Sequence, residues 1–228
     1  MVVVSMKELI TNVRPDYLQL LQKLWKKVQD YENQYGKDDA RKEFFVSFSQ
    51  LIVWVLIQFD DFIKTQDYST GKIKKYMTLD DASKPIMVTQ LDIINRASFL
   101  TKLMFDFEHF LKNILDHFNR NIPTGYGGIL NNYLDELGIT DMHTKNVLKL
   151  PSSVRNALHN NGYTKHSINS TILRNKTYVA NSGDQITFAG WDNIYIIIDE
   201  MTDCLITIID GNTRMNSENN IPRKPHLI

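Results

Sequence analysis

The chain has 228 residues, 43% of them hydrophobic and 23% charged, so it can bury a sizeable core as one large domain or two small ones. Its 26 Lys and Arg residues balance 26 Asp and Glu residues, which argues against a protein that coats nucleic acid through a broad basic surface. Cys204 is the only cysteine, which excludes an intrachain disulfide framework, argues against a cysteine-based zinc site and fits a reducing, cytoplasmic compartment.

No segment has the pattern of a membrane or secretion signal. The Val run within residues 1–10 is interrupted by polar and charged residues and is too short for a secretory signal. The stretch from Phe44 to Phe59 carries no charge, but it is shorter than the ~20 residues that a spanning helix needs. We interpret it as a buried core helix and expect no membrane partner.

The first half of the chain predicts long helices. One begins at Pro15 and ends near Tyr35, where Gly36 follows. A second, capped by Asp38 or Asp39, runs to about residue 64 and is apolar around most of its circumference, as in a central core helix or an oligomer interface. Residues 66–84 are polar without a clear period, which indicates a long connection or mobile loop.

A third long helix is expected from Pro85 to about Phe118, with Glu108 in the strongest part of its apolar pattern. Glu108 is either solvated or directed inward to a cationic partner. Residues 121–128 contain Pro and three Gly, but no Lys-Ser or Lys-Thr follows, so we interpret them as a turn rather than a phosphate loop. Short helices are expected at 129–137 and 141–150.

Pro151 suits the first position of a new short helix, which Gly162 ends. Residues 176–180 and 185–188 alternate in polarity, and the turn residues 181–184 between them predict a β-hairpin. Because one hairpin is not stable alone, it must lean on the helices.

Trp191 and Asp192 open the last expected helix, which Gly211 ends. Residues 194–198 alone would also fit a strand, but the continuing helical spacing argues against it. The polar residues 212–228 are expected to be disordered or loosely draped.

The strongest chemical candidates are Arg155 and His159, which lie four apart and so project from one face of a helix. The Arg fork matches phosphate oxygens, and His can take a proton from a hydroxyl and return one. Asn156 and Asn160 offer amides that can orient the imidazole or contact ribose. The alternative is a solvated Arg and a His that caps the end of its own helix.

Other residues compete poorly for a site. His109 and His117 lack partners at metal-ligand spacing, and no Gly-x-Ser-x-Gly or His-Glu-x-x-His motif is present in the sequence. We therefore expect neither a metal nor a cofactor.

The run Arg155-Asn156-x-x-His159-Asn160-Asn161-Gly162 resembles the signature of the HEPN superfamily, the higher eukaryote and prokaryote nucleotide-binding domains. The order around it is also similar: a long helix with Phe107-Glu108, the motif helix, a hairpin, and a closing helix opened by Trp191-Asp192. The resemblance covers about Ile86 to Gly211.

The resemblance implies an all-α antiparallel helical bundle with a small β-hairpin before its last helix. Together with the chain-order interpretation, it leads us to expect N-terminal helices at 1–84 packed on the same core, a HEPN-like domain at 85–211 and a flexible tail at 212–228. It implies a homodimer that cuts RNA without metal, often as a toxin or phage-defence effector controlled by an antitoxin or regulatory protein. Arg155 and His159 would then be catalytic, supported by Asn156, Asn160 and Glu108, the last holding the Arg.

Two hypotheses follow. One is a metal-independent endoribonuclease that acts by attack of the 2′-hydroxyl. The other is a non-catalytic helical module that binds a protein partner or a nucleotide, motivated by the zero net charge and by an Arg–His gap shorter than the usual family pattern.

Overall fold

The computed structural model describes residues 6–66 and 83–224. Within this part, β1 (Ile168–Leu173) and β2 (Lys176–Ala180) form an antiparallel pair, and the other elements are helical. The helices are α1 (Met6–Tyr35), α2 (Ala40–Gln66), α4 (Ser83–His117), α5 (Tyr126–Glu136), α6 (Met142–His159), α7 (Trp191–Gly211) and α8 (Thr213–Ser217). The fold is therefore all-α with one small hairpin before α7, which confirms that part of the prediction.

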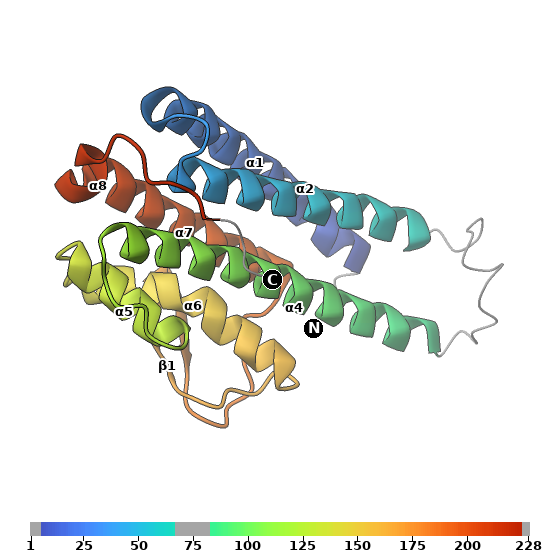
Figure 1. The fold of residues 1–228 in the computed structure, drawn as a ribbon. Helices are drawn as coiled ribbons and strands as arrows, with labels where there is room; N and C mark the ends of the chain where they lie inside the picture. Colours follow the sequence, from blue (N-terminus) through green and yellow to red (C-terminus); the bar gives the residue numbers. More distant parts are fainter. Residues whose placement is uncertain (1–5, 67–82, 225–228) are drawn as a thin grey trace.

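The two helices α4 and α7 lie in the middle of the bundle (Figure 1). On one side α1 and α2 pack against each other, α1 also against α7 and α2 against α4. On the other side α5 and α6 pack against α4, and α6 also contacts α7. The strand β1 lies against α6 and α7. This arrangement places the motif helix α6 beside the long helix α4.

One continuous cluster of buried apolar side chains extends from Ile10 to Ile221, so the N-terminal helices share their core with the rest of the described chain. Trp191 at the start of α7 connects several elements. Its ring meets the edges of Tyr17 from α1 and Phe59 from α2 at centroid distances of 6.0 and 5.0 Å. Its indole N–H donates to Asp92 of α4 at 2.7 Å. The prediction that a helix begins at Trp191 is confirmed, and these contacts fix the start of α7 in the core.

The prediction that Pro15 begins the first helix is wrong, because α1 begins at Met6 and contains Pro15. An internal Pro removes a backbone hydrogen bond and costs about 3 kcal/mol. Ile10 and Val13 continue the helical stripe of Tyr17 toward the N-terminus and are both buried. Burying them at about 1.5–3 kcal/mol each offsets the cost of the Pro.

Other boundaries moved by a few residues. The helix expected from Pro85 begins at Ser83, and the helix expected at 129–137 begins earlier, at Tyr126. Gly125, just before α5, has a φ of 82°, a conformation that Gly adopts without strain. Most of the connection expected at 66–84, namely residues 67–82, lies outside the described residues, as do residues 1–5 and 225–228.

A hairpin is present, but one of its two strands was predicted wrongly. Residues 176–180 pair with 168–173 and not with 185–188. The turn is Arg174-Asn175, where both residues have positive φ, 46° and 66°. This is the twist that a two-residue hairpin turn favours, with Asn tolerant of it and Arg much less so. Because Arg rarely adopts this conformation, Arg174-Asn175 is a weak turn signal in the sequence.

The prediction of a loose tail is also wrong for the described residues up to 224. Met215 of α8 and Ile221 are fully buried. The backbone N–H of Ile221 donates to the Asp39 carboxylate at 2.8 Å, and Arg41 donates to the carbonyls of Met215 and Glu218. This segment therefore completes the core at the start of α2.

The helix α2 is, over Ala40–Asp61, long and apolar enough to cross a membrane by length and composition, the one such helix among the described residues. In this structure 44% of the apolar window is buried. Phe45, Phe48, Ile52 and Val55 have no solvent exposure and pack into the common core. Because a core helix meets the same criteria, this feature is weak evidence for a membrane span.

Candidate functional site

The motif lies on the second half of α6, which is one helix and not the two that were predicted on either side of residue 150. Asp141 caps its start and accepts hydrogen bonds from the backbone of His143 and Thr144. Pro151 lies inside the helix and is itself buried. Val147 and Val154 are also buried and keep the apolar stripe continuous through the Pro. Core packing thus overrides the helix-breaking signal.

The motif helix ends as the sequence predicts. His159 is the last residue of α6, and Asn161 and Gly162 follow with φ of 55° and 88°. The Gly162 N–H turns back to the Ala157 carbonyl at 2.7 Å, which satisfies one of the free carbonyls at the helix end.

Replacing Gly162 with alanine should lower the free energy of unfolding by about 1 kcal/mol, because a Cβ is strained at this positive φ. Urea denaturation measures the change. Gly211→Ala is the control, since Gly211 has no positive φ and no atom lies within 4 Å of an added Cβ. An equal loss in both variants would contradict the role given to the left-handed turn.

Arg155 and His159 open into the same cleft, a space of ≈ 540 Å³ that we call the motif cleft. One wall, the helix wall, consists of Lys149 and Asn156 of α6 along with these two residues, and of Asn160 directly after the helix. A second, the loop wall, is the segment 164–167 that follows the helix. The start of α5 lines the remainder. The structure therefore brings together the four motif residues predicted from sequence.

The motif cleft is positively charged. No Asp or Glu is among the described residues that line it, whereas Lys149, Arg155 and Lys165 are. Within the described part of the chain these three cations form no ion pair with a carboxylate. Every other described arginine has such a partner: Arg14, Arg41, Arg96, Arg120, Arg174, Arg214 and Arg223. A concave surface with unneutralised charge of one sign attracts an anion.

Asn156 orients the Arg155 side chain. Its side-chain oxygen accepts hydrogen bonds from Nε and Nη2 of Arg155 at 3.1 and 2.8 Å. The sequence had assigned the Asn amides to the imidazole or to ribose, and the observed partners are different. Asn160 donates to the Tyr163 carbonyl at 3.0 Å and so fixes the chain just after the helix. An Asn that holds the guanidinium leaves the Arg charge intact, which a carboxylate partner would neutralise.

His159 contacts Thr101 of α4, a residue that the sequence did not indicate. The Thr101 Oγ1 and His159 Nε2 atoms are 2.8 Å apart, and both side chains are exposed. The capping alternative requires a bond from the His159 ring to the carbonyls at the end of α6, and the ring contacts Thr101 instead. A contact between residues 58 apart in sequence has no local signal, which explains why Thr101 was missed.

Glu108 forms its ion pair with Lys112, one turn further along α4, at 2.7 Å. It does not reach Arg155 as the resemblance implied. The two charges still share a neighbour, because both act on Tyr126 at the start of α5. Burial raises the pKa of Tyr126. To smaller extents, the Arg155 charge lowers this pKa and the Glu108 charge raises it. Glu108 therefore lies near the motif cleft without holding the Arg.

The loop wall is fixed by the turn at residues 181–184, the turn that the sequence placed inside a hairpin. Thr164 exchanges backbone hydrogen bonds with it, from Thr164 N to Asp184 O at 2.9 Å and from Gly183 N to Thr164 O at 2.8 Å. Ser182 donates from its hydroxyl to the Lys165 carbonyl at 2.8 Å. The backbone that carries Lys165 and His166 is thus held in place relative to α6.

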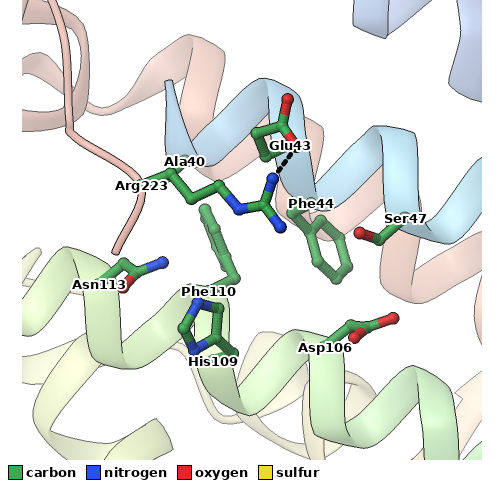
Figure 2. A pocket seen from close by; sticks show the side chains of 9 residues that line it. All are labelled: Ala40, Glu43, Phe44, Ser47, Asp106, His109, Phe110, Asn113 and Arg223. Atoms are coloured by element: carbon green, nitrogen blue, oxygen red, sulfur yellow. Dashed lines mark hydrogen bonds and ion pairs between the residues drawn. The ribbon is translucent and has the colours of Figure 1, made fainter. Parts of the chain in front are cut away.

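A second, smaller cavity lies between α2 and α4 (Figure 2). Its volume of ≈ 20 Å³ is suited to about one water molecule. Arg223 reaches over it to Glu43 at 2.8 Å, and Asp106 and His109 rise from α4 below. Among the described residues no three His, Cys, Asp or Glu side chains gather in a way that could hold a metal ion. The motif cleft is the better candidate site.

Comparisons with known proteins give no relative. No protein-family model, no curated protein and no solved structure matches this chain. The chemistry of the motif cleft therefore has to be argued from its own residues.

Proposed function

We propose that this protein is a metal-independent endoribonuclease of the HEPN type. The observation that carries the proposal is the motif cleft itself, which both Arg155 and His159 line. The Lys and Arg residues of this cleft have no carboxylate partner in the described chain. A phosphodiester beside a 2′-hydroxyl needs a base for the hydroxyl proton and a cation for the charge that builds on the phosphate oxygens. These are the two groups that the cleft offers. The same resemblance favours a cytoplasmic toxin or phage-defence effector, with an antitoxin or regulatory protein as its partner.

The reaction assigns one role to each residue. His159 takes the proton of the 2′-hydroxyl, whose oxygen attacks phosphorus. The bond from phosphorus to the 5′-oxygen breaks, that oxygen takes up a proton from water, and a 2′,3′-cyclic phosphate remains. Arg155 donates to the phosphate oxygens during the attack, with its fork preset by Asn156. No metal or cofactor takes part in these steps.

The contact with Thr101 engages Nε2 of His159 and leaves Nδ1 as the ring nitrogen without this contact. If the proton sits on Nε2 and Thr101 Oγ1 accepts it, Nδ1 is left as the base. We therefore assign Thr101 as a positioning residue that selects this tautomer.

Replacing Thr101 with valine should lower the cleavage rate about 2- to 10-fold, the effect of losing one net hydrogen bond of about 0.5–1.5 kcal/mol. Thr101→Ser should retain the wild-type rate because it keeps the hydroxyl. The ¹⁵N chemical shifts of the His159 ring report the tautomer and should change only in the valine variant. An unchanged ring signal together with a lower rate would contradict the positioning role.

A homodimer is part of the proposal, and the surface of α4 supports it. Leu91, Ile94 and Phe105 are exposed by 45%, 57% and 56%, and the helical spacing puts them on the face that carries Thr101. Large apolar side chains that share an exposed face favour an interface with another protein surface. A second copy of the chain on this face of α4 would place a second motif cleft near the first.

The proposal is tested by incubating the wild-type protein with total RNA in EDTA and analysing the new ends. We expect cleavage that EDTA does not reduce, with 2′,3′-cyclic phosphate on the upstream product. Loss of cleavage in EDTA that added Mg²⁺ restores would contradict the metal-independent mechanism. No cleavage of any RNA with or without metal would favour the alternative, a non-catalytic helical module.

A further inference from the structure

We infer that the motif cleft binds two neighbouring phosphates of one RNA strand between its two walls, and that it recognises the RNA backbone rather than the bases. This inference rests on the proposed function for the identity of its ligand. Arg155 binds the phosphate that reacts. Lys149 on the helix wall, together with Lys165 and His166 on the loop wall, binds a second phosphate.

The spacing along α6 makes room for a second phosphate. Lys149 and Arg155 are six residues apart, which corresponds to about 9 Å along the helix axis. That separation allows the two side chains to bind different phosphates, and both line the same cleft. Lys149 is exposed and has no carboxylate partner among the described residues, so its charge is available to a ligand.

The loop wall supplies charge from a fixed backbone. Lys165 and His166 are exposed side chains on a segment whose neighbours Thr164 and Ser167 are tied to the turn at 181–184. Thr164 Oγ1 donates to the Asn181 carbonyl, and Ser167 Oγ accepts from the Ser182 N–H at 3.2 Å. Because the segment is ordered before the ligand arrives, binding orders only the side chains of Lys165 and His166.

The cleft has little with which to recognise a base. Tyr126 is its only Tyr, Phe or Trp side chain among the described lining residues, and the Tyr126 hydroxyl is already bonded to the Leu148 carbonyl at 2.6 Å. The Asn156 oxygen is occupied by Arg155 and the Asn160 amide by the Tyr163 carbonyl. Stacking and edge contacts are the means by which proteins select single-stranded bases. The three cations Lys149, Arg155 and Lys165 are the strongest ligand-binding groups in the cleft, so we expect affinity to follow phosphate contacts.

The test measures the binding of a fluorescently labelled oligouridylate by the full-length His159→Ala variant at several salt concentrations. This variant should cut the RNA at least about a hundredfold more slowly than the wild type. For single strands the slope of log K against log salt changes by about 0.7 for each phosphate contact. Lys149→Ala and Lys165→Ala, each added to His159→Ala, should therefore each reduce the slope by about 0.7. Lys26→Ala, an exposed Lys on α1 outside the cleft, is the matched control and should leave the slope unchanged.

A labelled oligoadenylate gives the second readout, and its affinity should lie within about tenfold of that of oligouridylate. Unchanged slopes in both cleft variants, or an equal reduction in the Lys26 control, would overturn the inference. So would a base preference above about a hundredfold, the size that one good set of base-edge contacts gives. These results are independent of cleavage. A wild type that cuts no RNA but shows the expected slopes would refute the ribonuclease and support the two-wall binding site.

Discussion

Replacing His159 with alanine should lower the rate of RNA cleavage by about 10²–10⁴-fold, the usual contribution of a general base. The side chain is exposed at the end of α6, so the free energy of unfolding should change little. Single-turnover cleavage with saturating enzyme separates this effect from weaker binding. His143→Ala is the matched control, because His143 is exposed at the other end of the same helix and does not line the motif cleft.

Arg155 gives a complementary comparison. Arg155→Ala should cost on the order of 10²–10³ in rate, as the loss of one preset donor to the developing charge does. Arg155→Lys keeps the charge but loses the planar fork that Asn156 orients, and it should recover only part of the rate. Wild-type cleavage by the His159→Ala protein, or an equal loss in His143→Ala, would remove the catalytic assignment.

Replacing Asp39 with alanine should lower the free energy of unfolding by about 3–5 kcal/mol, because it leaves the Arg41 charge buried without its partner. Both side chains have no solvent exposure, and Arg41 Nε and Nη2 donate to the two Asp39 oxygens at 2.9 and 2.7 Å. The Arg41 guanidinium also lies 3.3 Å from the centroid of the Tyr35 ring. Denaturant unfolding with an unchanged m-value measures the loss.

Two controls bracket this result. Asp60→Ala breaks an ion pair with Arg14 in which both side chains are more than a third exposed, and it should cost less than about 1 kcal/mol. The double replacement of Asp39 by leucine and Arg41 by methionine removes both charges and should be less harmful than Asp39→Ala alone. If Asp39→Ala and Asp60→Ala cost the same, the buried pair does not have the role assigned to it.

Periodic patterns carried most of the fold prediction. Dense apolar spacing placed α2, α4 and α7 because these helices bury a stripe or more of their surface, and such burial is visible in any sequence window. Local breaker signals were less dependable. Pro15 and Pro151 both suggested helix starts, and both lie inside helices whose buried stripes continue across them. The free energy gained by burying several apolar side chains outweighs the loss of one backbone hydrogen bond at the Pro. A rule based on the Pro alone does not include the burial of its neighbours.

The local part of the candidate site could be predicted from the sequence, and the part that depends on tertiary packing could not. Their spacing of four residues along one helix predicted that Arg155 and His159 share a face, and both line the same cleft. Thr101, Lys165 and the turn at 181–184 join the site from other segments, and their contacts depend on how helices and loops pack. Glu108 shows the limit of the prediction, since its ion-pair partner is Lys112 on its own helix and not Arg155.

The docking of residues 213–222 has a consequence for biosynthesis. Asp39 and Arg41 leave the ribosome early, while the backbone groups of Met215, Glu218 and Ile221 that satisfy them follow about 174 to 182 residues later. Contacts this distant in sequence form late, because the loop between them must first close. Until residues 213–222 have been made, the Asp39–Arg41 pair lacks these carbonyl acceptors and this N–H donor. Completion of this core, and with it the final packing of α2 against its neighbours, therefore waits until residues 213–222 have been translated.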